Sequence, residues 1–269
     1  AHLLVGSEGT LSLTRSLNLK LSGLPAHKVL GIVNFPTFYQ AMDAAQHIVK
    51  LDQNRDLMAV ELVDRTMIDL ALQNPAFAPT MRTALSGDPA AILLVEFAGA
   101  DLGSLKAQLS RLEALMGDLK LPGSVVCMTD PSAQRNLWEV RKAGLNIMMS
   151  LRGDGKPVSF IEDCAVPLES LAEYTDALTG VFRKYGSRGT WYAHASVGTL
   201  HVRPILDMRR DGAKKMRAIA EEAAILVRKY KGAFSGEHGD GLVRSEWVAW
   251  QFGDRITKAF EAVKDAFDP

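Results

Sequence analysis

A continuous apolar segment, AAILLVEFAG at residues 90–99, restricts the fold of this chain more than any other feature. A run of this length that ends at a glycine is typical of a strand in the middle of a sheet, because an edge strand usually alternates apolar and polar residues. We therefore expect a buried central strand over residues 90–99.

The segments on either side of this run predict a mixed fold. Alternating or short apolar runs predict strands at residues 11–21, 27–36, 123–130 and 158–167, with two further short strands within 189–206. Residues 57–71 are expected to begin as a strand and to pass into a helix. Helical periodicity predicts helices at residues 37–52, 104–119, 132–151, 168–186 and 211–231. The order in the first half resembles a split βαβ unit. We expect an α+β fold, in which helices lie mainly on one face of an antiparallel sheet of about five to seven strands.

Composition excludes several classes of protein. The chain has 31 Lys and Arg residues and 31 Asp and Glu residues. The resulting net charge of zero gives no electrostatic argument for nucleic-acid binding. No apolar run approaches the ~18 residues that span a bilayer, and no signal peptide is recognisable, so we expect a cytoplasmic protein that is not transmembrane. The two cysteines, Cys127 and Cys164, lie in apolar surroundings and are expected to be buried free thiols.

Two histidines, His194 and His201, lie seven positions apart within YAHASVGTLHVRP. The residues around them favour strands, and Gly198 marks a turn between the strands. On such a hairpin the two imidazoles would face each other at ~5 Å between Cβ atoms, which is close enough to bind one metal ion. Two core histidines bonded to the backbone are an equally good interpretation of this pair alone.

A second stretch, FSGEHGDGLVRSEW at residues 234–247, is rich in glycine and contains Glu237 and His238. Glu237 could complete a His/His/Glu metal site with an open fourth position, and His238 could act as a base beside it. A glycine-rich turn with solvated charges is the alternative. The two stretches together supply a complete ligand set, which favours the metal site.

Two further stretches carry weaker signals. WEVRKAGLNIMMSLRGDGKP at residues 138–157 contains Arg141, Arg152 and Lys156, which suit a carboxylate substrate or ordinary surface ion pairs. VGSEGTL at residues 5–11 has backbone amides that could surround a phosphate, although such a segment is usually only a turn.

Taken together, the motifs resemble one known family. They occur in the order GSEGTL, WEVRKAG, EDCAVP, HASVGTLH and SGEHGDGLVR. This set resembles the FAD-linked oxidases of the vanillyl-alcohol-oxidase superfamily, and within them the branch of D-lactate dehydrogenases, the glycolate oxidase flavoprotein subunit and D-2-hydroxyglutarate dehydrogenase. The resemblance covers nearly the whole chain, and it implies the ferredoxin-like cap domain of such a flavoprotein.

The resemblance also implies a domain organisation. Residues 1–22 would be the terminal remnant of the FAD-binding domain, 23–245 the cap, or substrate, domain, and 246–269 a C-terminal helix leading back toward the FAD-binding domain. We expect a piece of a large member fused to an iron–sulfur region. FAD is expected in the full-length protein and not in this piece.

The family's site residues fall on particular positions of this chain. The implied ligands of a divalent metal, for which we expect zinc, are His194, His201 and Glu237. The implied catalytic base is His238. The implied flavin contacts are Gly6, Ser7, Glu8, Gly9 and Thr10.

The substrate-binding cations implied by the resemblance are Arg141 and Lys156. Relatives often carry Asn where this chain has Arg203, two positions after the second histidine. Arg203 would either bind a second substrate carboxylate, in which case it joins the substrate-binding set, or pair with a neighbouring acid.

The implied activity is oxidation of a D-2-hydroxy acid of the D-lactate, glycolate or D-2-hydroxyglutarate type to the 2-oxo acid, by hydride transfer to FAD. The expected partners are the small hydroxy acid and an electron acceptor, either a fused iron–sulfur domain or a quinone. Attachment to the periphery of the inner membrane and homo-oligomerisation remain open. The alternative is a non-catalytic ferredoxin-like binding or dimerisation module with core histidines.

Overall fold

A computed structural model describes residues 2–7, 9–52 and 55–268. The chain divides into two compact units, one of residues Pro25–Gly239 and one of Ala1–Leu24 with Asp240–Pro269. The predicted cap domain began at residue 23 and ended at residue 245, close to the bounds of the larger unit. The candidate site lies wholly within the larger unit.

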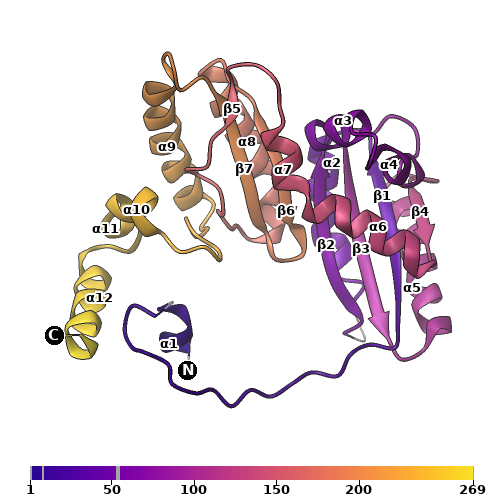
Figure 1. Cartoon of the computed structure of the whole chain (residues 1–269), viewed down its shortest axis with the longest axis horizontal. Coiled ribbons are helices and arrows are strands. Elements are labelled where there is room, and N and C mark those ends of the chain that lie inside the picture. Colours follow the sequence, from indigo (N-terminus) through magenta and orange to yellow (C-terminus); the bar gives the residue numbers. More distant parts are fainter. Residues whose placement is uncertain (1, 8, 53–54, 269) are drawn as a thin grey trace. The chain divides into compact units, whose positions relative to one another are not determined.

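The larger unit contains a seven-stranded sheet in the order β4-β1-β3-β2-β6-β7-β5, and every pair of neighbours is antiparallel (Figure 1). Its strands are β1 (His27–Phe35), β2 (Leu57–Asp64), β3 (Ala91–Gly99), β4 (Val125–Met128), β5 (Lys156–Pro157), β6 (Gly189–His194) and β7 (Thr199–Leu206). The apolar run at 90–99 forms β3, which pairs on both sides as predicted. The α+β class and the antiparallel sheet are confirmed.

The helices of this unit lie between the strands along the chain, except for α9, which follows the last strand. They are α2 (Phe38–Val49), α3 (Arg65–Gln73), α4 (Ala78–Ala84), α5 (Leu102–Asp118), α6 (Pro131–Lys142), α7 (Gly144–Met149), α8 (Leu171–Lys184) and α9 (Gly212–Lys229), with short 3-10 turns η1 (Leu168–Ser170) and η2 (Ala195–Val197). Side chains cap the N-termini of several helices. Thr37, Asp64 and Asp130 accept hydrogen bonds from backbone N–H groups in the first turns of α2, α3 and α6, respectively. The single helix predicted at 132–151 is instead two helices, α6 and α7.

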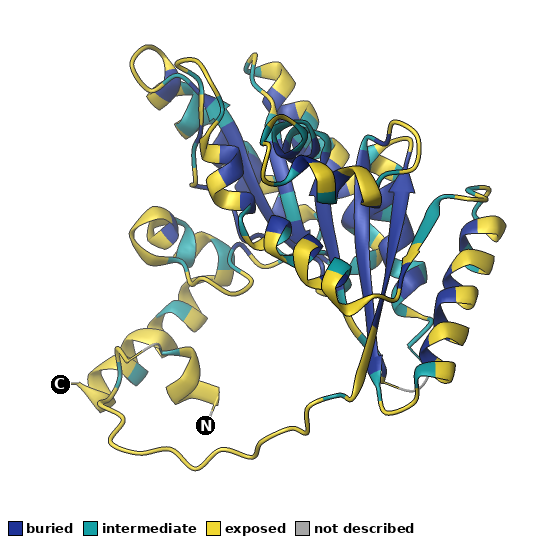
Figure 2. Cartoon of the chain, turned by 45° about the vertical axis from the view of Figure 1, so that its right-hand side comes forward, coloured by how far each residue is buried: buried dark blue, intermediate teal, exposed yellow. Residues whose placement is uncertain are grey.

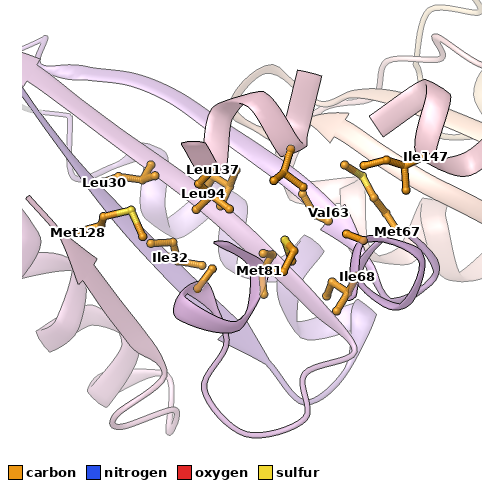
Figure 3. Packing of buried hydrophobic residues seen from close by; sticks show 14 residues of the cluster. Leu30, Ile32, Val63, Met67, Ile68, Met81, Leu94, Met128, Leu137 and Ile147 are labelled. Atoms are coloured by element: carbon orange, nitrogen blue, oxygen red, sulfur yellow. The ribbon is translucent and has the colours of Figure 1, made fainter. Parts of the chain in front are cut away.

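One face of the sheet packs against α3, α4, α6 and α7 (Figure 3). The cluster includes Leu30, Ile32, Ile92 and Leu94 from the strands, and Met67, Met81, Leu137 and Ile147 from the helices. The intervening strand residues point to the other face, because successive side chains of a strand alternate. Strands β1, β2, β3 and β7 are accordingly buried over most of their length, and the buried strands stand out in Figure 2.

The other face is covered by α2 and α5, which contact β1 and β3. The close approach of α5 depends on Gly31, where a Cβ would lie 2.6 Å from Cδ2 of Leu112. The expectation that helices lie mainly on one face therefore differs from the structure, in which helices cover both. The reason is the apolar run itself, because consecutive apolar residues on β3 bury both of its sides.

Two predicted strands are wrong. Residues 12–25 have no regular structure, and alternation alone cannot form a strand without a neighbour to take its backbone hydrogen bonds. Residues 158–167 are mostly irregular, and Asp163 has φ +75°, a left-handed conformation that interrupts an extended strand. Only Ala165 makes isolated bridges, to Thr199 and Ala233.

Both cysteines are free, as predicted, but Cys127 is exposed and only Cys164 is buried. Cys127 lies on β4, the edge strand of the sheet, which explains its exposure.

The smaller unit contains α1 (His2–Gly6), α10 (Gly241–Arg244), η3 (Ser245–Trp247), α11 (Val248–Phe252) and α12 (Asp254–Phe267). Among the described residues, no helix is both long and apolar enough to cross a membrane.

Candidate metal and substrate site

The two histidines of the first motif lie on one β-hairpin and share one face of it. In the register of β6 and β7, His194 is opposite Thr199 and His201 is opposite Tyr192. The imidazoles are therefore diagonal neighbours. The prediction that they would lie directly opposite each other is wrong. Their ring centroids are 5.0 Å apart with perpendicular planes. They face the same side of the sheet, which the metal hypothesis requires.

The turn between the strands depends on Gly198. Its φ is +72°, and a Cβ there would lie 2.1 Å from the carbonyl oxygen of Val166. Any other residue would have to displace that backbone, so glycine is required both by conformation and by space.

A loop after α9 brings Glu237 and His238 to the hairpin. The Oε1 atom of Glu237 lies 2.9 Å from Nε2 of His201, 3.4 Å from Nε2 of His194 and 3.5 Å from Nε2 of His238. Three imidazole nitrogens thus surround one carboxylate oxygen. The two stretches identified in the sequence converge at a single point.

Asp163 holds this loop in position. Its buried carboxylate accepts hydrogen bonds from the backbone N–H groups of Glu237 at 2.9 Å and His238 at 2.8 Å, and from the hydroxyl of Ser235. Its own carbonyl accepts from the N–H of Gly236 at 2.6 Å. The left-handed backbone of Asp163 aims both its carboxylate and its carbonyl at the same loop.

Glu61 on β2 connects the hairpin to α6. Its Oε1 lies 2.8 Å from Nδ1 of His194, and its Oε2 accepts a hydrogen bond from Nη2 of Arg141 at 2.7 Å. The side chains of Glu61 and Arg141 are 10% and 12% exposed, so this is a largely desolvated ion pair.

Aromatic rings stack through the centre of the site. His201 is stacked between Tyr192, at 4.6 Å between centroids, and His238, at 5.2 Å. The guanidinium of Arg141 lies 4.7 Å from the ring centroid of Tyr192, within the range of a cation–π contact. Tyr192 thereby joins the histidine cluster to the arginine.

The two hairpin histidines differ in electrostatics. Burial, together with the neighbouring His194 and His238, lowers the pKa of His201 to about 3, so His201 is neutral at physiological pH. The hydrogen bond to Glu61 raises the pKa of His194 above its usual value. Nδ1 of His201 is buried without a hydrogen-bond partner among the described residues.

The donor atoms fit a divalent metal. A tetrahedral ion with ligands at 2.0–2.2 Å separates its donor atoms by about 3.3–3.6 Å. For the three predicted ligands, the 3.4 Å from Glu237 Oε1 to Nε2 of His194 matches this value, and the 2.9 Å to Nε2 of His201 is shorter. His238, the predicted base, lies 3.5 Å from the same oxygen. A group of four donors that all lie within 4.8 Å of one another consists of Asp163, His201, Glu237 and His238, and it does not include His194. The oxygens of Asp163, however, already accept hydrogen bonds from the loop.

A cavity of about 980 Å³ adjoins the cluster. Glu61, Arg141 and His194 line it, and Lys28, Glu96 and Trp138 line it as well. The cavity is much larger than a small hydroxy acid, and Arg141 is the cation that lies both in its wall and beside the histidines.

The other predicted cations lie elsewhere or are engaged. Nζ of Lys156 donates to the carbonyl of Leu151 at 2.5 Å, and Lys156 pairs with Leu206, five residues along β7 from His201. The structure does not bring Lys156 to the cluster. Arg203 is buried, pairs with Glu162 and donates to the hydroxyl of Tyr192 at 3.0 Å. Of the two alternatives for Arg203, the structure has the pairing with a neighbouring acid.

The predicted flavin contacts belong to the smaller unit. Gly6 ends α1, and the N–H groups of Ser7 and Thr10 bond to the carbonyls of Leu3 and Ser7 at 3.1 and 2.9 Å. These two amides are used inside a turn, so in this arrangement they do not form a phosphate cradle. Gly9 has φ +84°, and Glu8 lies outside the described residues.

Sequence reasoning missed Glu61, Tyr192, Glu162 and Asp163 as site residues. Glu61 follows apolar residues in a strand and precedes others, so an acidic residue on a buried strand was an available signal. Asp163 and Glu162 lie within the EDCAVP motif, which the sequence marked without assigning them a role.

Two solved structures share the fold of this chain. One of them is p-cresol methylhydroxylase in its substrate-bound form. The TM-score is 0.65 at 14% sequence identity, and the superposition covers 91% of this chain and 51% of the p-cresol methylhydroxylase chain. For 4-ethylphenol oxidase from Gulosibacter chungangensis the TM-score is 0.64 at 12% identity, over 93% and 53%. At this identity the likeness shows that the fold is shared, and nothing beyond the fold.

Sequence comparison gives the family. The model of the "FAD linked oxidases, C-terminal domain" matches residues 24–269, and the chain belongs to this family. The resemblance identified from the motifs is confirmed.

Three curated relatives align over all of this chain. D-2-hydroxyglutarate dehydrogenase of Pantoea ananatis is 31% identical, over 27% of its own length. Glycolate oxidase subunit GlcD of Bacillus subtilis is 26% identical over 54% of its length, and the mitochondrial D-lactate dehydrogenase [cytochrome] of Arabidopsis thaliana is 25% identical over 45%. The chain thus spans between about a quarter and about half of the length of these relatives.

Proposed function

We propose that this chain is the cap domain of an FAD-dependent dehydrogenase that oxidises a D-2-hydroxy acid to the 2-oxo acid. The convergence of three imidazole nitrogens on Glu237 Oε1, next to Arg141, is the observation that carries the proposal. Names of the relatives support the substrate class, because they are dehydrogenases or oxidases of D-2-hydroxyglutarate, D-lactate and glycolate.

His194, His201 and Glu237 would hold a divalent metal, and the nitrogen-rich donor set favours zinc. When bound, such an ion supplies Lewis-acid polarisation of the substrate hydroxyl. A neutral His201, whose pKa is lowered to about 3, suits this role because a ligand nitrogen must carry a lone pair.

His238 is proposed as the catalytic base. It takes the hydroxyl proton of the substrate at Nε2, while its Nδ1 lies 3.4 Å from Oε1 of Glu162. Arg141 binds the substrate carboxylate from the cavity wall, and a planar guanidinium suits two parallel hydrogen bonds to that group. When bound, FAD supplies the acceptor for the hydride that leaves Cα.

The wider organisation follows the same proposal. Residues 1–22 would belong to the FAD-binding domain, and 246–269 would lead back to it. The electron acceptor would be a fused iron–sulfur domain or a quinone, and the protein would act in the cytoplasm or at the periphery of the inner membrane.

The test is turnover by the full-length protein that contains this chain, with a panel of D-2-hydroxy acids and an artificial electron acceptor. We expect turnover of D enantiomers, with a deuterium isotope effect at Cα. His238→Ala should reduce kcat by ~10²–10⁴. His47→Ala, on α2 and away from the cluster, should have no effect. Turnover of aryl alcohols but of no D-2-hydroxy acid would contradict the proposal.

A further inference from the structure

Glu61 occupies a position that links two groups of the site. It is the direct cross-strand partner of His194 in the pairing of β2 with β6, so both side chains leave the sheet on the same face. One carboxylate oxygen contacts Nδ1 of His194 at 2.8 Å and the other contacts Nη2 of Arg141 at 2.7 Å. The residue is 8% exposed, so water cannot readily replace either partner.

The chemistry of the three partners determines where the protons lie. Arg141 can only donate, and a carboxylate paired with it can only accept. Nδ1 of His194 must therefore donate to Oε1 of Glu61. In the neutral ring, Nε2 then carries the lone pair, and this is the atom that points toward Glu237 at 3.4 Å.

We propose that Glu61 is a positioning residue that holds His194 as the Nδ1–H tautomer, so that Nε2 is free to bind the metal. The inference rests on the proposed function for the metal, but the tautomer itself can be measured without one. A carboxylate that orients a histidine ligand from behind commonly contributes 10–100-fold to metal affinity.

Replacement by glutamine reverses the arrangement. The amide oxygen of Glu61→Gln must face Arg141, because Arg141 offers only donors. The amide NH₂ group then faces Nδ1 of His194 and donates to it. The imidazole proton moves to Nε2, where it blocks the metal. Glu61→Asp keeps an acceptor-only group and is expected to retain the original tautomer.

Glu96 provides a matched control. It lies on the neighbouring strand β3, lines the same cavity and is 7% exposed. Its carboxylate also accepts from two donors, Nζ of Lys28 at 2.8 Å and Nε1 of Trp138 at 2.8 Å. Glu96→Gln therefore has a comparable structural cost without any contact to His194.

The experiment measures the imidazole tautomer by ¹⁵N NMR in the metal-free protein, in alkaline buffer where His194 is neutral, with the signal assigned by its loss in His194→Asn. We expect Nδ1–H in the wild type, in Glu61→Asp and in Glu96→Gln, and Nε2–H in Glu61→Gln. Zinc affinity, measured on the same samples, should fall about 10–100-fold in Glu61→Gln alone.

The outcomes separate the two claims. The same tautomer in wild type and Glu61→Gln would overturn the inference, whether or not zinc binds. A tautomer that changes in Glu61→Gln while the wild type binds no zinc would support the role of Glu61 and overturn the metal assignment. If Glu61→Gln does not fold, an Nε2–H tautomer in the wild type or in Glu61→Asp overturns the inference, and Nδ1–H in both supports it.

Discussion

The carboxylate of Asp163 accepts a hydrogen bond from the backbone N–H of His238 at 2.8 Å. The two residues are 75 positions apart in the chain, so this contact brings the EDCAVP and GEHGDG motifs together. Because the same carboxylate also accepts from the N–H of Glu237, the orientation of both functional side chains depends on Asp163.

Asp163→Asn should loosen this loop. Asparagine tolerates the left-handed backbone, but its NH₂ group would face the N–H donors that Asp163 now accepts. We expect the free energy of unfolding to fall by about 1.5–3 kcal/mol, measured by urea denaturation, and zinc affinity to fall with it. The control is Asp154→Asn, in an exposed ion pair with Arg209, which should cost less than about 1 kcal/mol. Equal effects of the two variants would contradict the role of Asp163.

Gly198→Ala should distort the hairpin that carries both histidines. Gly198 and Gly123 have nearly equal φ values of +72° and +71°, but only Gly198 lacks room for a Cβ. Gly123→Ala should therefore cost about 1 kcal/mol for the backbone conformation alone. Gly198→Ala should cost about 1–3 kcal/mol more, because the carbonyl of Val166 must move. Thermal unfolding of the two variants tests this, and equal shifts in Tm would refute the steric explanation.

Asp64 should make stability depend on pH. Burial raises the pKa of Asp64 from 3.8 to about 6, although the N–H groups of Met67 and Trp191 oppose this shift. The folded state then binds more protons than the unfolded state between these values, so the free energy of unfolding should decrease as pH rises from about 4 to about 6. The decrease should be on the order of 2–3 kcal/mol and should be absent in Asp64→Asn. An unchanged pH profile in that variant would exclude Asp64 as its source.

Arg141 and Arg203 should differ in their effects on catalysis. Arg141 lines the cavity, whereas the guanidinium of Arg203 is occupied by Glu162 and Tyr192. In the full-length enzyme, Arg141→Met should mainly raise KM for the hydroxy acid. Arg203→Met should lower the free energy of unfolding by about 3–5 kcal/mol and leave KM of the folded fraction unchanged. A large KM effect from Arg203→Met would restore it as a substrate-binding residue.

Local patterns predicted most of the fold correctly. The apolar run of β3 and the strand-forming residues around Gly198 depend on near neighbours, so the sequence was enough to predict a buried strand and a hairpin. The register was not predictable, because the 3-10 turn Ala195–Val197 places His194 opposite Thr199 instead of His201. The strand predicted at 158–167 does not form. Asp163 has a left-handed backbone there, and it contacts a loop more than 70 residues away along the chain, which local patterns do not reveal.

The candidate site was predictable where residue type alone carries chemistry. His194, His201 and Glu237 were identified as metal ligands and His238 as a base, and the four side chains do converge. Glu61 was not identified. An acidic residue in an apolar strand marks the position as unusual, but it does not reveal the partner His194, which lies 133 positions along the chain. Lys156 and Arg203 were predicted from their charge to bind substrate. In the structure, Lys156 donates to the carbonyl of Leu151, and Arg203 forms an ion pair with Glu162.

Calorimetric titration of the purified protein with zinc tests the central claim most directly. We predict one zinc ion per chain, with affinity at least tenfold lower in His201→Ala, since a tetrahedral site with an open position has only three protein ligands. His47→Ala should bind like the wild type, because His47 lies on α2 outside the cluster. Failure of the wild type to bind zinc, or equal binding by wild type and His201→Ala, would contradict the assignment of His194, His201 and Glu237 as metal ligands.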